Sequence, residues 1–188
     1  MRTHVALLRG INVGGHNKVA MADLRAITTL LGHADVATYI QSGNVVFTSS
    51  ETDTTKLAAS LEAEIARRLG VEPSVVVLSR RELKQVIDDN PYPQEANPRC
   101  LHVVCRREKL SSEQLAAVAA AERRAKDKGS PDEVTVIGRT LYLRTPGGFG
   151  RSELVMQLSR SKTATMTDRA TTARNWATVT ELMAMLNE

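Results

Sequence analysis

The order of apolar runs along the chain is the feature that most restricts its fold. Short apolar runs alternate with amphipathic helical patterns in the order β-α-β-β-α-β, and the same order then occurs a second time. The expected strands are His4–Arg9, Val36–Gln41, Asn44–Thr48, Ser74–Leu78, Arg99–Cys105, Val134–Ile137, Thr140–Arg144 and, weakly, Ala164–Thr167. The expected helices are Met21–Leu31, Thr54–Leu69, a short one from Ser79 to Ile87, Ser111–Lys126, Ser152–Ser159 and Thr172–Leu186.

Each set of six segments matches the ferredoxin-like arrangement, in which right-handed crossovers place both helices on one face of the sheet. The sequence therefore predicts an α+β protein with two consecutive ferredoxin-like subdomains and antiparallel sheets. We expect the first subdomain, with a short connecting helix, at residues 1–90. A proline-rich linker at 91–98 and a second subdomain with a C-terminal helix at 99–188 follow. The two halves are not visibly similar in sequence, so the pattern alone indicates a duplication.

Composition limits the class of protein. A hydrophobic content of 42% and a charged content of 24% are those of a globular chain that forms a core. No apolar run approaches the roughly 20 residues of a membrane helix, and the N-terminal run is too short for a signal peptide. We therefore expect a cytoplasmic protein without a membrane segment. The two cysteines, Cys100 and Cys105, fall on opposite faces of one strand, and the four histidines lack metal-site spacing, so we expect no metal and no cofactor.

The most informative stretch lies between the first strand and the first helix. Because the third strand of a ferredoxin-like unit pairs with the first, the loop after the first strand is expected beside the turn before the third. We call these two stretches, Arg9–Lys18 and Gln41–Asn44, the loop edge. Its candidate ligand-binding residues are Arg9, Gly10, Asn12, Gly14, Gly15, Lys18, Gln41, Ser42 and Asn44.

The loop edge has two interpretations that the residues leave open. Glycines, two cations and a following helix N-terminus suit a small anionic or nucleotide-like ligand. The stretch matches neither a Walker loop nor a dinucleotide-binding fingerprint, however. The other interpretation is a tight structural turn held by Asn12 and capped through the amide of Asn17 or Asn44, with Ser42-Gly43 forming a two-residue hairpin turn.

A second, weaker candidate is a cationic patch in the second half. The loop 145–151 and the segment after the fourth strand are expected at one end of the sheet, which would bring together Arg151, Ser152, Arg174 and Asn175. Arg174 is expected near a helix start, where a cation opposes the helix dipole, so an acidic partner such as Glu153 is one explanation. An intramolecular ion pair or a solvated arginine is the other.

Other functions have less support from the residues. Nucleic-acid binding is disfavoured because aromatic residues make up only 3% of the chain and the first strand has none for stacking. An enzyme is not indicated, since no serine or histidine lies in a recognisable catalytic motif. A structural or assembly module without a ligand stays open.

Three motifs resemble a bacterial family of uncharacterised proteins, known only as a domain of unknown function. They are Leu8–Gly15, Tyr39–Phe47 and Ala173–Thr178. The resemblance implies two ferredoxin-like subdomains and no activity. It covers the residues of the loop edge, Gly150–Ser152 and Arg174–Trp176, whereas Glu153 and Ala177 depart from the family pattern, in which lysine and asparagine are common.

Overall fold

Two compact units make up the described part of the chain. The structure, a computed structural model, describes residues 1–161, 163 and 171–188. One unit comprises Met1–Ile87 with Thr180–Glu188, and the other comprises Asp88–Val179. The segment predicted as a linker, 91–98, therefore falls within the second unit, and the end of the C-terminal helix groups with the first.

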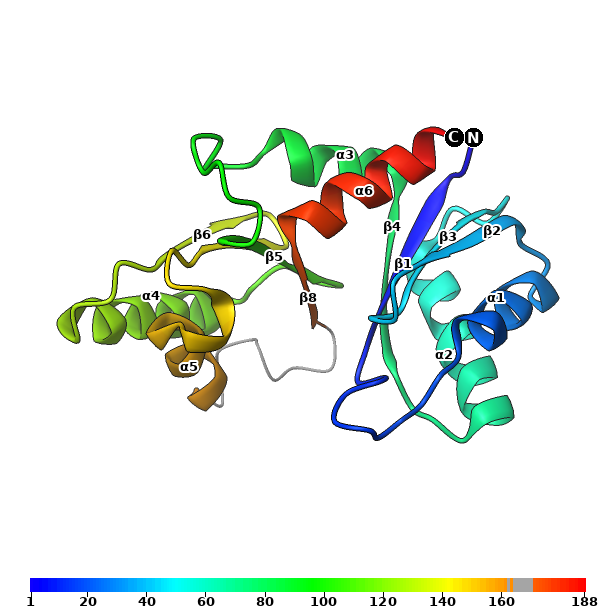
Figure 1. Ribbon diagram of the computed structural model, residues 1–188, viewed down its shortest axis with the longest axis horizontal. Helices are drawn as coiled ribbons and strands as arrows, with labels where there is room; N and C mark the ends of the chain where they lie inside the picture. Colours follow the sequence, from blue (N-terminus) through cyan, green and yellow to red (C-terminus); the bar gives the residue numbers. More distant parts are fainter. Residues whose placement is uncertain (162, 164–170) are drawn as a thin grey trace. The chain divides into compact units, whose positions relative to one another are not determined.

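The first unit contains a four-stranded antiparallel sheet (Figure 1). Its strands are β1 (His4–Arg9), β2 (Ala34–Tyr39), β3 (Asn44–Thr48) and β4 (Ser74–Ser79). Their spatial order is β2-β3-β1-β4, with β1 paired antiparallel to both β3 and β4. This is the strand order of a ferredoxin-like unit, and it confirms the predicted fold class.

Helices α1 (Met21–Leu30) and α2 (Thr54–Leu69) cover one face of this sheet (Figure 1). The ends of α2 follow from local sequence. Asp53 accepts hydrogen bonds from the backbone N–H groups of Thr55 and Lys56, and Gly70 ends the helix in the left-handed conformation at φ +64°. Leu57, Ala58, Leu61 and Ile65 of α2 are buried in the core with Ala6, Leu8, Val45, Phe47, Val75 and Val77 of the strands.

The opposite face of the first sheet is buried as well. Because side chains alternate along a strand, Val5 and Leu7 of β1 point away from α1 and α2, and both are at most 1% exposed. Helix α3 (Arg80–Asp88) follows β4 through a capping box formed by Ser79 and Glu82. The backbone N–H of Ser79 donates to Glu82 Oε2 at 2.8 Å, and the backbone N–H of Glu82 donates to Ser79 Oγ at 3.3 Å.

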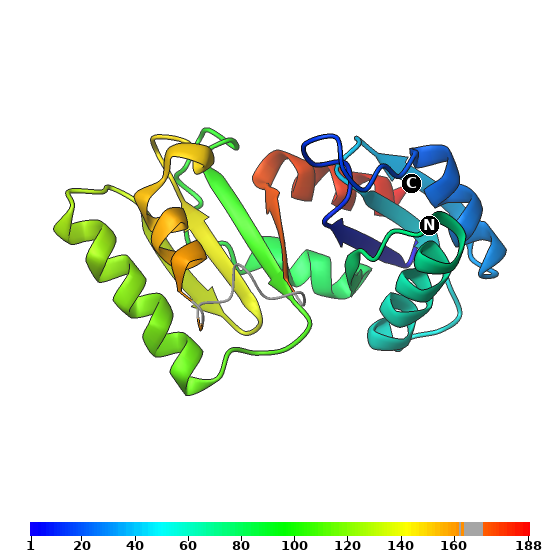
Figure 2. The same ribbon diagram turned by 90° about the horizontal axis from the view of Figure 1, so that it is seen from below.

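The second unit repeats this topology with different residues. Its strands are β5 (Leu101–Arg106), β6 (Glu133–Ile137), β7 (Thr140–Arg144) and β8 (Thr171–Asn175), in the order β6-β7-β5-β8. Helices α4 (Ser112–Asp127) and α5 (Glu153–Arg160) cover one face of the sheet, and a 3-10 turn, η1 (Phe149–Arg151), leads into α5 (Figure 2). The core beneath them contains Val104, Val118, Ala121, Ala125, Leu141, Leu143, Leu154 and Leu158. Ser111 and Gln114 form a capping box at the start of α4.

Two predicted segments differ from the observed ones. Ser42 and Gly43 do not form a two-residue turn, because β2 ends at Tyr39 and the connection to β3 comprises residues 40–43. The last helix does not begin at Thr172: residues 171–175 form β8, and α6 spans Trp176–Asn187. Pairing with β5 overrides the helical pattern there, and the sequence alone does not reveal that pairing. The weak strand predicted at Ala164–Thr167 lies outside the described residues.

Candidate functional site

The two stretches of the loop edge lie side by side. In the pairing of β1 with β3, Leu7 lies opposite Asn44, and the backbone N–H of Leu8 donates to the carbonyl of Gly43 at 2.8 Å. The chain therefore leaves β1 at Arg9 directly beside the turn that precedes β3. This is the juxtaposition that the ferredoxin-like topology predicted.

Asn12 connects the loop to the turn. Its Nδ2 donates to the carbonyls of Val19, at 2.9 Å, and Gln41, at 3.0 Å, while its Oδ1 accepts from the backbone N–H of Val19 at 2.9 Å. The residue has φ +54°, a conformation that asparagine tolerates better than most residues. A single amide side chain thus closes the loop on itself and attaches it to the neighbouring turn.

Two more asparagines hold the same region. Asn17 Nδ2 donates to the carbonyl of Gly10 at 2.8 Å. Asn44 is fully buried, and its Nδ2 donates to the carbonyl of Tyr39 and to Ser42 Oγ, both at 2.9 Å. These hydrogen bonds are internal, so the three amides shape the loop edge. Asn17 and Asn44, the two asparagines that the sequence indicated for a structural turn, both contribute: Asn17 within the loop after β1, and Asn44 within the turn before β3.

The glycines of the loop edge have two different roles. Gly14, at φ +58°, has no atom within 4 Å of the position that a Cβ would take, so only its backbone conformation requires glycine. Gly43, at φ +79°, is also confined by packing, because a Cβ there would lie 2.6 Å from Ile11 Cδ1 and 2.8 Å from Leu8 Cβ. The turn before β3 therefore approaches β1 too closely for any side chain.

The two cations of the loop edge have different surroundings. Arg9 is half-buried and, because Leu8 faces the core, it points to the sheet face away from α1 and α2. Lys18 is exposed, three residues before the start of α1, and forms no ion pair with the described residues. The residue before α1, Ala20, supplies no side-chain cap to the first turn of that helix. Lys18 thus shortly precedes, in sequence, a helix start whose backbone N–H groups receive no side-chain cap from Ala20.

Two apolar side chains at this edge are exposed. Val13, in the loop, is 70% exposed, and Ile40, in the turn, is 50% exposed. Ile40 also has φ +46°, a conformation that is an outlier for a β-branched residue. The sequence did not indicate Ile40 as a site residue, because Ile40 lies inside the predicted strand Val36–Gln41.

The predicted cationic patch of the second unit is not assembled. Ala173 packs against the core under α4 and α5, so Arg174, next to it on β8, faces the opposite side of the sheet from α5. Its Nη1 donates to Thr172 Oγ1 at 2.6 Å and to the Ala173 carbonyl at 2.8 Å. Burial lowers the pKa of Arg174 to about 10, which still leaves it protonated at neutral pH. Asn175 accepts from the backbone N–H of Thr178 at 2.8 Å within the first turn of α6.

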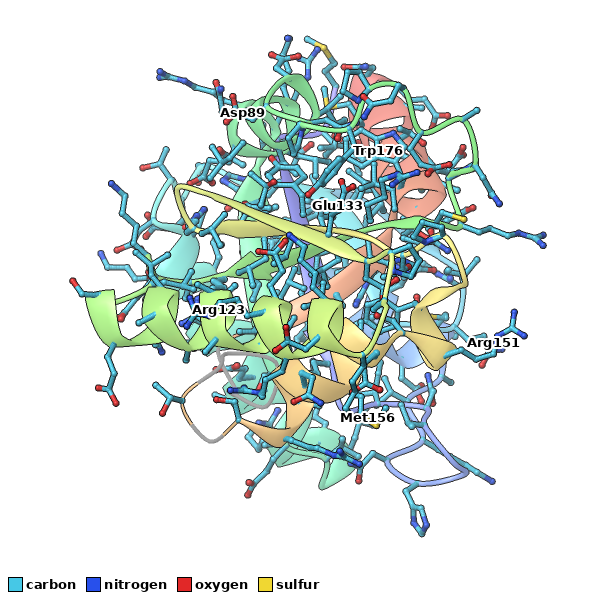
Figure 3. All side chains as sticks on the ribbon, turned by 90° about the vertical axis from the view of Figure 1, so that its left-hand side faces the viewer. Asp89, Arg123, Glu133, Arg151, Met156 and Trp176 are labelled. Carbon is cyan, nitrogen blue, oxygen red and sulfur yellow. The ribbon has the colours of Figure 1, made fainter. Side chains whose placement is uncertain are left out.

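Arg151 and Ser152 remain together at the start of α5. Arg151 is exposed, and Figure 3 shows its side chain extending outward. Ser152 is buried and caps the helix, with its Oγ accepting from the backbone N–H of Val155 at 3.0 Å. Glu153, one of the partners considered for Arg174, pairs with Lys128 at 2.6 Å, and this contact lowers the pKa of the Glu153 carboxyl.

Sequence reasoning also missed a buried carboxylate beneath these residues. Asp132 is 3% exposed, and its Oδ2 accepts from the hydroxyls of Ser130 and Ser152, each at 2.7 Å, and from the backbone N–H of Leu154 at 3.4 Å. In the sequence, Gly129-Ser130-Pro131-Asp132 has the pattern of an ordinary turn after a helix. Asp132 and Ser152 lie 20 positions apart, so the sequence does not reveal their contact.

The histidines and cysteines show no catalytic or metal-binding arrangement. His102 lies in β5, with its ring 4.2 Å from that of Phe149, and burial lowers its pKa to about 4. Burial raises the pKa of the Cys105 thiol to about 11, so that thiol is unreactive at neutral pH. Residues 1–161, 163 and 171–188 contain no group of three or more histidine, cysteine, aspartate or glutamate side chains placed to hold a metal. Every helix in those ranges falls short of the length and apolar character of a membrane span.

The duplicated strand order, with helices on one face of each sheet, defines the class: an α+β protein with two ferredoxin-like units. A family model described as "Protein of unknown function (DUF1697)" matches residues 1–142, and the chain belongs to that family. This confirms the resemblance inferred from the motifs, although the third motif, Ala173–Thr178, lies beyond the matched residues.

A solved structure of a conserved bacterial protein from Streptococcus pneumoniae is similar to this chain. The two share 24% sequence identity with a TM-score of 0.72, over 98% of each chain. At that identity the likeness establishes the fold alone. No match to this chain was found among curated proteins.

Proposed function

We propose that the protein binds a small anionic, nucleotide-like ligand at the loop edge. The observation that carries this proposal is Ile40. A β-branched residue in the left-handed region costs about 1–3 kcal/mol, and strain of that kind persists where the surrounding structure enforces it and gathers at ligand sites. Half of the Ile40 side chain is exposed, so burial does not account for its conformation.

The surrounding contacts enforce the conformation of this turn. Asn44 holds the carbonyl of Tyr39, directly before Ile40, and Asn12 holds the carbonyl of Gln41, directly after it. These two hydrogen bonds hold the backbone on either side of Ile40, whose side chain is half exposed. A surface that presents an apolar side chain through a rigid hydrogen-bonded frame is preorganised for a contact.

The neighbouring groups support the chemistry of the ligand. Lys18 contributes an exposed positive charge, and the uncapped first turn of α1 contributes backbone N–H donors, so an anionic group such as phosphate is favoured. Val13 and Ile40 contribute exposed apolar surface that suits the flat, weakly polar part of a nucleotide. Asp23, in the first turn of α1, opposes the anion and sets a modest affinity.

Titrations with adenosine 5′-monophosphate, inorganic phosphate and adenosine test this proposal on the full chain. Binding to the native state raises stability by about 2.7 kcal/mol at a ligand concentration 100 times Kd. We expect adenosine 5′-monophosphate to raise the melting temperature more than inorganic phosphate or adenosine does alone. Lys18→Ala should reduce that rise, whereas Lys109→Ala, which removes another exposed lysine, should leave it unchanged. The assignment would be falsified if adenosine 5′-monophosphate left the melting temperature of the parent protein unchanged, or raised that of Lys18→Ala as much as that of the parent.

The internal bonds of the three asparagines favour a second candidate, a structural module without a ligand. In that case the loop edge serves only to stabilise the fold, and the double variant Arg9→Ala/Asn44→Ala should lose much of its stability. Under the binding proposal, Ile40→Gly relieves the strain and leaves the protein as stable as before or more so, while ligand affinity falls. A loss of stability in the double variant with unchanged ligand affinity in Ile40→Gly supports the structural module. A loss of ligand affinity in Ile40→Gly at unchanged or raised stability supports binding.

A further inference from the structure

The second unit contains a hollow of about 470 Å³ that the loop edge does not involve. Residues from three segments line it: Lys128–Asp132 after α4, Gly147 in the loop after β7, and Arg151–Glu153 at the start of α5. A volume of this size lies within the range of small-molecule sites.

The buried carboxylate of Asp132 is the unusual group in this hollow. All three of its hydrogen bonds, from Ser130, Ser152 and the Leu154 N–H, reach the same oxygen, Oδ2. Among the residues that the structure describes, none donates a hydrogen bond to Oδ1. Oδ1 is not among the buried side-chain atoms that lack a partner, so it is accessible. A carboxylate accepts through both oxygens, so this open oxygen suits a ligand that brings a donor.

The other charged side chains of the hollow indicate which charges a ligand should carry. Lys128 and Glu153 neutralise each other at 2.6 Å, and Gln157 also donates to Glu153 Oε1 at 2.6 Å. Asp132 is therefore left as a negative charge at depth. Arg151 is left as an exposed positive charge at the rim, with no ion-pair partner among the described residues. Charges of opposite sign at the two levels of one hollow complement a zwitterion.

We infer that this hollow binds a small zwitterion, with an ammonium group donating to Asp132 Oδ1 and a carboxylate held by Arg151. A metal ion fits less well, because Asp132 is a single carboxylate and the exposed Arg151 at the rim repels a cation. An inorganic anion alone fits less well, because it would approach a buried aspartate without a donor. The site is independent of the loop edge, which belongs to the first unit.

A series of ω-amino acids tests the inference on the full chain: glycine, β-alanine, 4-aminobutyrate and 5-aminopentanoate. The distance between the two charges rises along the series, so one member should bind better than its neighbours. Propylamine and propionate, each carrying one of the two charges, should bind more weakly than the best zwitterion. Binding is measured by backbone amide chemical shifts, and the shifted signals should come from residues 128–132 and 147–153.

Three variants assign the charges. Arg151→Ala should weaken binding about fivefold, as expected for a partly exposed pair, while Arg123→Ala, an exposed arginine on α4, should have no effect (Figure 3). Asp132→Asn keeps an acceptor for Ser130 and Ser152, and it should abolish binding while circular dichroism reports an intact fold. Should that variant unfold, Arg151→Ala and Arg151→Lys carry the test alone, with partial binding expected for lysine.

Several results would overturn the inference. One is the absence of shifts in these two segments with every member of the series. Another is equal binding of propylamine, propionate and the zwitterions. The neighbouring hollow of about 420 Å³ shares Ser130–Asp132 with this one and is also lined by Tyr92, Glu122 and Lys126. Shifts at those three residues without shifts at 147–153 would place the ligand there instead. None of these outcomes depends on nucleotide binding at the loop edge, so the two proposals fail separately.

Discussion

Gly43→Ala should destabilise the protein far more than an alanine at Gly14. Both glycines have positive φ, +79° and +58°, so each substitution forces alanine into the left-handed region at a cost of about 1–2 kcal/mol. Only the methyl group at residue 43 meets other atoms, 2.6 Å from Ile11 Cδ1 and 2.8 Å from Leu8 Cβ. Leu8 Cβ is fixed to the backbone of β1, so the strand itself must shift.

The difference between the two variants isolates this overpacking. Forcing an extra methyl into a packed region costs about 1–3 kcal/mol, which gives a total of about 2–5 kcal/mol for Gly43→Ala against about 1–2 kcal/mol for Gly14→Ala. Urea denaturation followed by far-ultraviolet circular dichroism measures both. Ile11→Val removes the Cδ1 atom, so in the Gly43→Ala background it should cost less than in the parent protein. Equal destabilisation at both glycines, or no coupling with Ile11, would refute the packing argument.

Three further predictions concern the same fold. Asn12→Ala loses three hydrogen bonds and acquires backbone strain, so it should cost about 2–4 kcal/mol in urea denaturation; Asn12→Gly, which keeps the backbone conformation, should cost less. Asp53→Ala removes the N-terminal cap of α2 and should cost about 1 kcal/mol, while Asp127→Ala should be nearly neutral. Acid should weaken the protein through His102, because its folded pKa of about 4 lies below the unfolded value of 6.5. The unfolded state then binds the proton first, so stability is complete above pH 6.5 and falls as the pH drops toward 4. With allowance for partial exposure, the loss at pH 5 is about 1 kcal/mol; His102→Leu should show a smaller loss between pH 7.5 and 5 than the parent, and an unchanged loss would contradict the assignment.

The loop edge shows how far sequence reasoning extends toward a site. Topology placed Arg9–Lys18 beside Gln41–Asn44, because strand order follows from the order of the elements and from right-handed crossovers. The role of each side chain did not follow. Asparagine amides suit a ligand or a backbone carbonyl equally well, and only the distances of 2.9 and 3.0 Å from Asn12 to Val19 and Gln41 assign them to the loop itself.

The sequence by itself determined the element order, both ferredoxin-like units and the capped helices, because these depend on periodicity and on residues within a few positions of one another. The tertiary structure alone decided three features. Residues 171–175 form β8 by pairing with β5, whose residues lie 65 to 73 positions earlier in the chain. Ile40 is held in a strained turn, since Asn12 and Asn44 bond on either side of it. Asp132 meets Ser152 across 20 residues. Contacts between residues distant in sequence leave no local pattern, so a chain read in order does not reveal them.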